Sequence, residues 1–314
     1  GIRYLVRSRG LGDVYKRQKQ LGTLQHISNL YYTEPCAKLA QLLCEKTGMK
    51  KVFFGNSGAE ANECAIKAAR KWSEEKKGKD YSTIITLKNS FHGRTITTLA
   101  ATGQDVFHHD FTPLTEGFVY AEPNDLADLE QLIKANKCAA VMMEVVQGEG
   151  GVMPLDEAYV KGAAKLCEQY DLLLICDEVQ VGNGRSGKLY GYMHYGVQPD
   201  IVSTAKGLAG GLPLGATLLG EKVQDVLSAG THGSTFGGNP VCCAGAINVL
   251  SRLDEKMLEG VEERSAYIKQ ELAGAKGVLG VSGLGLMLGI QTEKTRPTSS
   301  PPAAKRACWS SRPK

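Results

Sequence analysis

The fold is indicated most clearly by the stretch Leu172-Leu173-Leu174-Ile175-Cys176-Asp177-Glu178-Val179-Gln180. Its first five residues are all apolar, which predicts a strand over Leu172–Cys176 that is buried on both faces, as in a parallel sheet covered by helices. The run ends abruptly in two carboxylates and, shortly after, an amide. Because ligands of open α/β sheets gather at the carboxyl ends of the strands, Asp177 and Gln180 are predicted to lie at a binding site. The alternative is a strand-ending acid that only caps a helix.

The same pattern continues outward from this strand. From about Leu30 to about Gln270, short apolar or β-branched runs alternate with stretches of helical period. Further strands are predicted at Val52–Phe54, Thr83–Leu87, Ala139–Val145, Ile201–Thr204 and Gly215–Leu219. Helices are predicted over Ala61–Trp72 and Asn239–Leu253. The chain is therefore predicted to be an α/β protein with a mainly parallel sheet covered by helices.

The composition is ordinary for a globular enzyme. The chain has 314 residues, of which 42% are hydrophobic and 22% charged, enough for one large domain and part of a second. No apolar run approaches the roughly eighteen residues that span a bilayer, and no secretory signal is visible, so we expect no membrane role and a cytoplasmic location. The nine cysteines are predicted to be buried, reduced thiols, and the six histidines suggest no metal site.

The net charge of +4 comes from the two ends of the chain. Residues 1–18 carry a net charge of +4 and residues 295–314 a net charge of +5, which leaves −5 for the residues between them. The basic character therefore belongs to the ends. The central region has a net negative charge, which argues against nucleic-acid binding by that region.

A second chemical feature is the stretch Phe53-Phe54-Gly55-Asn56-Ser57-Gly58-Ala59-Glu60-Ala61, a strand that passes through a glycine turn into a helix. Ser57 followed three residues later by Glu60 fits a capping box, which leaves the amides of Gly58 and Ala59 free in the first turn. Such amides, aligned with the helix dipole, bind phosphate. The alternative is a well-capped helix without a ligand.

A third feature is the stretch Asp200-Ile201-Val202-Ser203-Thr204-Ala205-Lys206-Gly207-Leu208, a short apolar strand that ends on an amine followed by glycine. A lysine at the end of a strand can form a Schiff base, and its free amine can act as the acid and base that moves a proton. A lone lysine is usually a solvated surface charge. The neighbouring strand and glycines favour a reactive role for Lys206.

These three segments, in this order, resemble the class III aminotransferases, a group of fold-type I pyridoxal-phosphate enzymes. Three further motifs match: Phe91-His92-Gly93-Arg94, Glu144–Gly151 and Thr231–Pro240. The resemblance spans roughly residues 19–294. It implies a large cofactor-binding domain over residues 19–270 and the start of a small C-terminal domain over residues 271–294.

The resemblance implies a site for the pyridoxal ring. Lys206 would hold the cofactor covalently and shuttle the proton. Asp177 would face the pyridine nitrogen and keep it protonated, which makes the ring an electron sink. Gln180 would lie near the ring oxygen, and Phe91 would stack on the ring face, although core packing is the alternative for this phenylalanine.

The resemblance also implies a phosphate site that two subunits share. The backbone amides of Gly58 and Ala59 would hold the cofactor's phosphate, and the hydroxyl of Thr235 would reach it from the neighbouring subunit. A homodimer with shared active sites is therefore expected.

Three residues are implied as substrate contacts. Arg94 is similar to the arginine that binds the α-carboxylate of acetylornithine, and a guanidinium grips a carboxylate well. Ser234 would lie beside the same substrate, and Glu149 resembles a gate that pairs with an arginine in one half-reaction and releases it in the other. An exposed arginine and a surface glutamate are the alternatives.

The expected reaction is transamination of N-acetylornithine with 2-oxoglutarate, which gives N-acetylglutamate 5-semialdehyde and glutamate and serves arginine biosynthesis. This choice of donor depends on finer likeness at Ile27–Pro35 and Phe91–Arg94. Succinylornithine, ornithine and 4-aminobutyrate remain alternative donors, and an aminomutase of the same fold is an alternative enzyme.

Both ends of the chain are expected to lie outside the resemblance. Residues 1–18 lack a pattern and are predicted to be non-native, and residues 295–314 form a basic tail predicted to be disordered. The family's arginine for the 2-oxoglutarate carboxylate is expected beyond the matching region. A truncated fragment without activity is therefore a further alternative.

Overall fold

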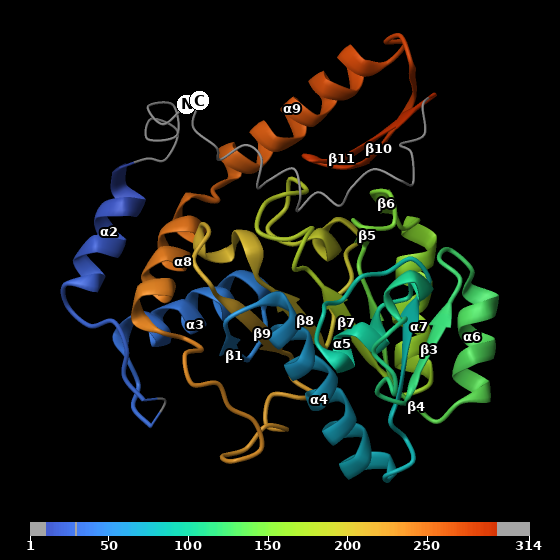
Figure 1. The fold of residues 1–314 in the computed structure, drawn as a ribbon, viewed down its shortest axis with the longest axis horizontal. Coiled ribbons are helices and arrows are strands. Elements are labelled where there is room, and N and C mark those ends of the chain that lie inside the picture. The colour runs from blue at the N-terminus through green and yellow to red at the C-terminus, as the bar shows by residue number, and fades with distance from the viewer. Residues whose placement is uncertain (1–10, 29, 294–314) are drawn as a thin grey trace.

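A seven-stranded sheet forms the centre of the molecule in the computed structural model, which describes residues 11–28 and 30–293 (Figure 1). The strands run in the order β1-β9-β8-β7-β4-β2-β3. Their bounds are β1 (Lys51–Gly55), β2 (Thr83–Leu87), β3 (Phe118–Ala121), β4 (Cys138–Met143), β7 (Leu173–Asp177), β8 (Ile201–Thr204) and β9 (Gly215–Leu219). β9 is antiparallel to both of its neighbours, β1 and β8, and the other strand pairs of this sheet are parallel. The predicted α/β class and mainly parallel sheet are confirmed.

The strand predictions fail in two places. β3 was not predicted, because it has only four residues at the sheet edge and three of them are half-buried, so no long apolar run marks it. The direction of β9 was also not predicted. The connection from Thr204 to Gly215 is shorter than the dozen or so residues that a parallel crossover needs, so β9 returns beside β8 in the opposite direction.

Helices cover both faces of this sheet. They are α2 (Leu11–Leu21), α3 (Glu34–Thr47), α4 (Gly58–Lys77), α5 (Ile96–Ala101), α6 (Leu126–Ala135), α7 (Glu157–Gln169), α8 (Pro240–Arg252) and α9 (Glu255–Leu272). Alternate residues of β7 point to opposite faces: Leu173 and Ile175 join one buried cluster with α4, and Leu174 and Cys176 join the other. Because both faces are buried, the central strands read as continuous apolar runs.

The C-terminal part of the described chain stands apart from the main sheet. Figure 1 shows α9 and the hairpin β10 (Val278–Leu284) and β11 (Met287–Thr292) above the main body. The hairpin reaches the body near its turn, where the amide of Leu286 donates to the carbonyl of Arg185 at 2.9 Å. The division into a large and a small domain at residues 270–271 stays a prediction.

The two ends differ from each other. Residues 11–18, which lie in the segment predicted to lack a pattern, belong to helix α2, which packs against α8. This tertiary contact supports a helix whose sequence gives little sign of it. The tail of residues 295–314 lies outside the described residues. Within the described part of the chain, no helix is both long and apolar enough to cross a membrane.

Candidate active site

The candidate site lies at the carboxyl edge of two neighbouring parallel strands. Asp177 ends β7, and Lys206 follows β8 at the start of a short 3-10 helix, η3 (Lys206–Ala209). The Lys206 Nζ donates a hydrogen bond to Gln180 Oε1 at 2.8 Å. The backbone φ of Lys206 is +48°, a left-handed conformation that is rare for a residue with a side chain and recurs at functional sites. The structure thus brings the predicted lysine and amide together.

An open pocket of about 600 Å³ lies beside Lys206. Its walls include Val179, Gln180 and Asn183 on one side and Met287 of the hairpin on another. Lys206 is exposed at this pocket, whereas the strand before it is buried. The amine is therefore accessible to a small molecule.

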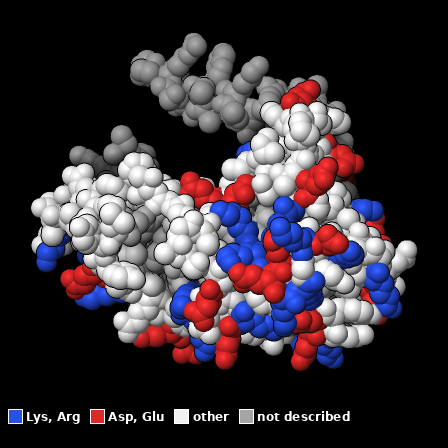
Figure 2. All heavy atoms as spheres, turned by 90° about the horizontal axis from the view of Figure 1, so that it is seen from below, with Lys and Arg blue, Asp and Glu red and all other residues white. Residues whose placement is uncertain are grey.

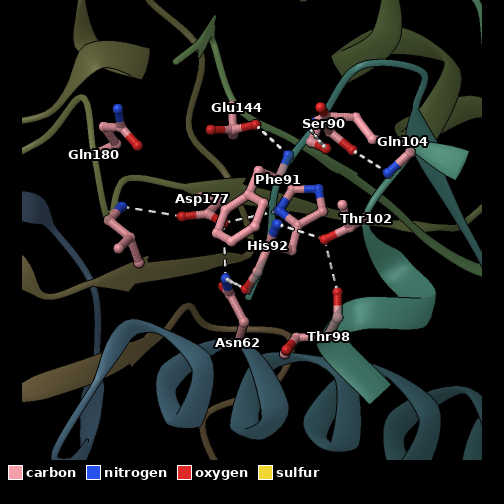
Figure 3. A network of polar contacts seen from close by, with 12 residues as sticks. Asn62, Ser90, Phe91, His92, Thr98, Thr102, Gln104, Glu144, Asp177 and Gln180 are labelled. Carbon is pink, nitrogen blue, oxygen red and sulfur yellow. Dashed lines mark hydrogen bonds and ion pairs between the residues drawn. The ribbon is translucent and has the colours of Figure 1, made fainter. Parts of the chain in front are cut away.

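Asp177 is held by three donors (Figure 3). Its Oδ2 accepts from Asn62 Nδ2 at 2.7 Å and from His92 Nδ1 at 2.8 Å, and its Oδ1 accepts from the amide of Val179 at 3.0 Å. Asp177 is 3% exposed, and these bonds fix the position of a buried carboxyl group.

His92 is itself fixed by the segment behind it. Its amide donates to Thr102 Oγ1 at 3.0 Å, and its carbonyl accepts from Asn62 Nδ2 at 2.7 Å. Neither His92 nor Asn62 was predicted as a site residue. A signal was present for Asn62, because it is a polar residue on a helix whose neighbours Ala61 and Cys64 are buried.

Glu178 turns away from the site into the protein. It is fully buried, and its carboxyl oxygens accept from the amides of Gly191 at 2.7 Å and Tyr192 at 2.9 Å. Burial raises the pKa of Glu178 to about 8. Of the two adjacent acids, only Asp177 contacts the polar groups of the site.

The first turn of α4 approaches the same region. Ser57 is the N-cap and its Oγ accepts from the amide of Glu60 at 3.2 Å, as predicted. The second half of the predicted capping box is wrong, because the Glu60 carboxylate accepts from the amide of Asn56, not from that of Ser57. The amides of Gly58 and Ala59 are in the first turn of a 20-residue helix, where no intrahelical acceptor exists.

The approach of α4 depends on the lack of a side chain at Gly58. A Cβ at this position would lie 2.6 Å from Val179 Cγ1, a distance at which the atoms clash. A Cβ at Gly93 would in turn lie 3.0 Å from the Cβ of Ala59. The three motifs around Gly58, Gly93 and Val179 therefore converge, and the free amides of α4 lie close to the end of β7.

Arg94 lies against two aromatic rings. The carbon of its guanidinium is 5.1 Å from the ring centre of Phe91 and 4.3 Å from that of Phe107, and the two rings meet edge to face at 5.7 Å. Among the described residues Arg94 makes no ion pair, so its N–H groups remain available to a carboxylate. Phe107, in the 3-10 helix η1 (Asp105–Phe107), was not predicted, since a single phenylalanine in a loop carries no motif.

The structure does not bring every predicted site residue to the pocket beside Lys206. Ser234 and Thr235 lie in the loop before α8 and line a different pocket, with Asn56 and Glu60. Ser234 Oγ accepts from Asn56 Nδ2 at 3.1 Å. Glu149 is exposed in the turn between β5 (Val146–Gln147) and β6 (Met153–Pro154).

The residues that do converge suit pyridoxal phosphate. An accessible amine suits its aldehyde, a buried fixed carboxylate suits a protonated pyridine nitrogen, and free helical amides suit its phosphate. Phe91 offers an aromatic face nearby. On a mainly parallel sheet with these groups at its carboxyl edge, fold and site define a pyridoxal-phosphate-dependent transferase of fold-type I.

Comparison with known proteins identifies the family. Residues 14–308 match the family described as aminotransferase class-III, a match longer at both ends than the predicted residues 19–294. The chain is 53% identical over 275 residues to the acetylornithine aminotransferase of Haemophilus ducreyi, covering 88% of this chain and 70% of that protein. It is 46% identical over 282 residues to the succinylornithine transaminase of Salmonella typhimurium, covering 88% and 69%.

Solved structures agree with this family. The ornithine aminotransferase of Toxoplasma gondii has a TM-score of 0.86 at 33% identity, with 91% of this chain and 70% of that chain covered. The N-acetylornithine aminotransferase of Stenotrophomonas maltophilia has a TM-score of 0.78 at 36% identity, with 91% and 72% covered. The chain belongs to the class III aminotransferases, whose cofactor is pyridoxal phosphate.

Proposed function

We propose that this chain is an acetylornithine aminotransferase, with N-acetylornithine as amino donor and 2-oxoglutarate as acceptor. The observation that carries the proposal is Arg94, whose guanidinium lies against the rings of Phe91 and Phe107 with its donors available to a substrate carboxylate. Three acetylornithine aminotransferases that are 45% to 53% identical to the chain support this donor. We expect the products to be N-acetylglutamate 5-semialdehyde and glutamate, within cytoplasmic arginine biosynthesis.

The proposed chemistry follows from the groups around Lys206. Pyridoxal phosphate supplies a carbonyl that takes up the amino group and a ring that withdraws electrons. Asp177, fixed by Asn62 and His92, holds a negative charge where the pyridine nitrogen would lie and keeps that nitrogen protonated. The Lys206 amine moves the proton, and Gln180 orients that amine through its 2.8 Å hydrogen bond.

The substrate and phosphate contacts complete this proposal. Arg94 binds the α-carboxylate of the donor in a bidentate manner, and Ser234 lies beside the same substrate. Glu149 acts as a gate that pairs with an arginine in one half-reaction. Gly58 and Ala59 hold the phosphate through their amides.

A homodimer would bring Thr235 to the phosphate of the other subunit. Two observations support this arrangement. Thr235 lies in a pocket separate from that of Lys206, and the walls of a neighbouring pocket include Tyr31 and Tyr32, which are 67% and 100% exposed. Figure 2 shows a broad uncharged area on one side of the face seen from below, with mixed charges on the rest of that face. Exposed aromatic side chains such as those of Tyr31 and Tyr32 are typical of subunit contacts.

A panel of amino donors tests the proposed reaction. Purified protein with added pyridoxal phosphate and 2-oxoglutarate should form glutamate from N-acetylornithine with a higher kcat/KM than from ornithine or 4-aminobutyrate. Arg94→Lys, which keeps the charge but loses the bidentate grip, should lower kcat/KM for N-acetylornithine by about tenfold or more. Turnover of 4-aminobutyrate without turnover of N-acetylornithine would contradict the proposal.

Succinylornithine is a second candidate donor, because relatives named succinylornithine transaminase are 44% to 46% identical to the chain. The same panel separates the two acylated donors by their kcat/KM values. An aminomutase would instead isomerise a single substrate without 2-oxoglutarate. A control reaction without 2-oxoglutarate, analysed for an isomer of the donor, tests this alternative.

A further inference from the structure

Glu144 is a buried acid at the candidate site for which the proposed reaction gives no role. It directly follows β4, the strand between β2 and β7, and it is 3% exposed. Figure 3 shows its carboxyl group pointing toward the backbone of Phe91, on the same side of the network as Asp177. A buried carboxyl group is costly unless its oxygens are hydrogen-bonded, so its partners indicate why it is there.

The carboxyl group of Glu144 joins two separate segments. Its Oε2 accepts from the amide of Phe91 at 2.9 Å. Phe91 belongs to the ring-stacking motif, whereas Glu144 itself lies four residues before Gly148, which directly precedes the proposed gate residue Glu149. One hydrogen bond therefore ties the Phe91 backbone to the segment that leads into the Gly148–Glu149 turn.

These two segments also touch each other elsewhere. The Gln147 Nε2 donates to the carbonyl of Lys88 at 2.8 Å. A Cβ at Gly150 would lie 2.7 Å from the carbonyl oxygen of Asn89. The turn that carries Glu149 is thus packed closely against the strand end that leads into Phe91, and the bond from Glu144 is the one of these contacts that reaches Phe91 itself.

The Gly148 end of this link reaches Lys206 through one intermediate side chain. A Cβ at Gly148 would lie 2.4 Å from Gln180 Nε2, so the Gly148 backbone lies directly against that amide group. Gln180 in turn binds the amine of Lys206. Glu144 therefore supports the backbone next to two side chains of the site: the ring of Phe91 and the Gln180 amide that orients Lys206.

Burial and the nearby Asp177 both raise the pKa of Glu144 well above its usual value. Glutamine has the same shape and no charge, and so is the closest substitute.

We infer that Glu144 is a positioning residue of this enzyme, whose carboxyl group holds the Phe91 segment against the strand end that leads into the Gly148–Glu149 turn. The inference rests on the proposed functions of Phe91, Gln180 and Glu149. Glu144 itself contacts neither the Lys206 amine nor the substrate. Its role is to hold the backbone of residues that do.

Hydrogen exchange on the cofactor-free chain tests the link directly. The peptide that covers the amide of Phe91 should exchange at least about tenfold faster in Glu144→Ala than in the wild type, because this amide loses its acceptor. In Glu144→Gln one acceptor oxygen remains, so the increase should be smaller. This measurement needs neither cofactor nor turnover, and so it stays informative if the proposed donor is wrong.

Cofactor affinity, measured by absorbance titration with pyridoxal phosphate, gives the functional consequence. The dissociation constant should rise by about tenfold in Glu144→Ala and less in Glu144→Gln. Glu178→Ala is the matched control, because Glu178 is also a buried acid that binds two backbone amides but lies away from Phe91 and the gate. It should lower the melting temperature without changing the dissociation constant.

Several outcomes would overturn the inference. One is unchanged exchange at Phe91 in Glu144→Ala or, if that variant does not fold, in Glu144→Gln. Another is unchanged cofactor affinity in the same variant. A third is an equal loss of affinity in Glu178→Ala, which would make general destabilisation the cause. If the wild type does not bind pyridoxal phosphate at all, the proposed function fails, whereas the exchange result still decides the link.

Discussion

Asp177 and Glu178 are adjacent acids, yet the end of β7 sends their side chains in opposite directions. Asp177 accepts from two side chains and one amide of the site, and Glu178 accepts from two amides of η2 (Gly191–His194). Successive residues of a strand alternate between faces, so neighbouring acids with equal chemistry receive different partners. The hydrogen-bond partners, and not the residue type, therefore distinguish the site acid Asp177 from the structural acid Glu178.

Removal of the Lys206 amine should abolish covalent cofactor binding. Lys206→Ala should lose the visible absorbance of pyridoxal phosphate bound to lysine, because no other predicted site residue offers an amine at the pocket. Lys222→Ala, which removes an exposed lysine paired with Asp200 at 3.2 Å, is the matched control and should keep that absorbance. Retention of the absorbance in Lys206→Ala would place the reactive lysine elsewhere.

The buried carboxyl of Glu178 should make stability depend on pH. Its pKa rises from 4.5 to about 8 on folding, so between these values the folded state holds a proton that the unfolded state has lost. The free energy of unfolding should therefore fall with rising pH by up to about 1.4 kcal/mol per pH unit across this window, and become flat above it.

Urea denaturation at several pH values from 5 to 9 measures this effect. Glu178→Gln cannot ionise, so its slope should be shallower than that of the wild type across the same window. Glu144 and other groups contribute equally to both proteins, and the difference between them isolates Glu178. Parallel curves for the two proteins would show that Glu178 does not titrate as inferred.

The sequence identified the site residues that lie inside motifs but not those that support them. Lys206, Asp177 and Gln180 follow apolar strands, and that position alone draws attention to them. Asn62 and Phe107 lie in a helix and a loop without such a marker, and they reach the site only through folding. Asn62 could have been selected as a polar residue on a buried helical stripe, whereas Phe107 could not.

At the scale of elements, the start of α4 and the end of β7 meet closely enough to exclude a single methyl group. Gly58→Ala would place a Cβ 2.6 Å from Val179 Cγ1, so either α4 or the Val179 side chain must move. The variant should lose about 1–3 kcal/mol of stability, because overpacking in a dense region costs this much. It should also bind pyridoxal phosphate more weakly, since the amides of the first turn shift.

A second substitution tests whether this contact is the cause. Gly58→Ala combined with Val179→Ala removes the clash and should recover part of the lost stability and affinity, as coupled neighbours do. Gly22→Ala is the control, since a Cβ there would meet only ordinary contacts at 3.6 Å. Equal losses in the single and double variants would exclude the Val179 contact as the cause. Melting temperatures and absorbance titrations give both quantities.

Most strands were predictable because both faces of the sheet are covered. Double burial produces apolar runs, and the ranges Thr83–Leu87, Ile201–Thr204 and Gly215–Leu219 agree with the structure. The edge strand β3 and helix α2 were missed, since partial burial in one and tertiary contact with α8 in the other leave weak local patterns. The direction of β9 is set by the length of its connection, not by its composition.

At the scale of the whole molecule, the separation of Thr235 from the Lys206 pocket leads to a prediction about two copies of the chain. Consider a mixed dimer in which one copy carries Lys206→Ala and the other carries Thr235→Ala. If each site takes Thr235 from the partner, one site of this dimer has both residues intact and the other site has neither. Each variant alone should have low activity or cofactor retention, because every site then lacks one group.

Mixing the two variants therefore tests the shared site. After the two variants are unfolded and refolded together, about half of the dimers should contain one copy of each variant. About a quarter of all sites should then contain both Lys206 and Thr235, as in the wild type. If Thr235 served its own subunit instead, every site in the mixed dimer would lack one group and mixing would restore nothing. The readout is glutamate formation or, independently of the donor, the amount of tightly retained pyridoxal phosphate. Because both arrangements predict the same behaviour for each variant alone, only the mixture distinguishes a site within one chain from a site between two.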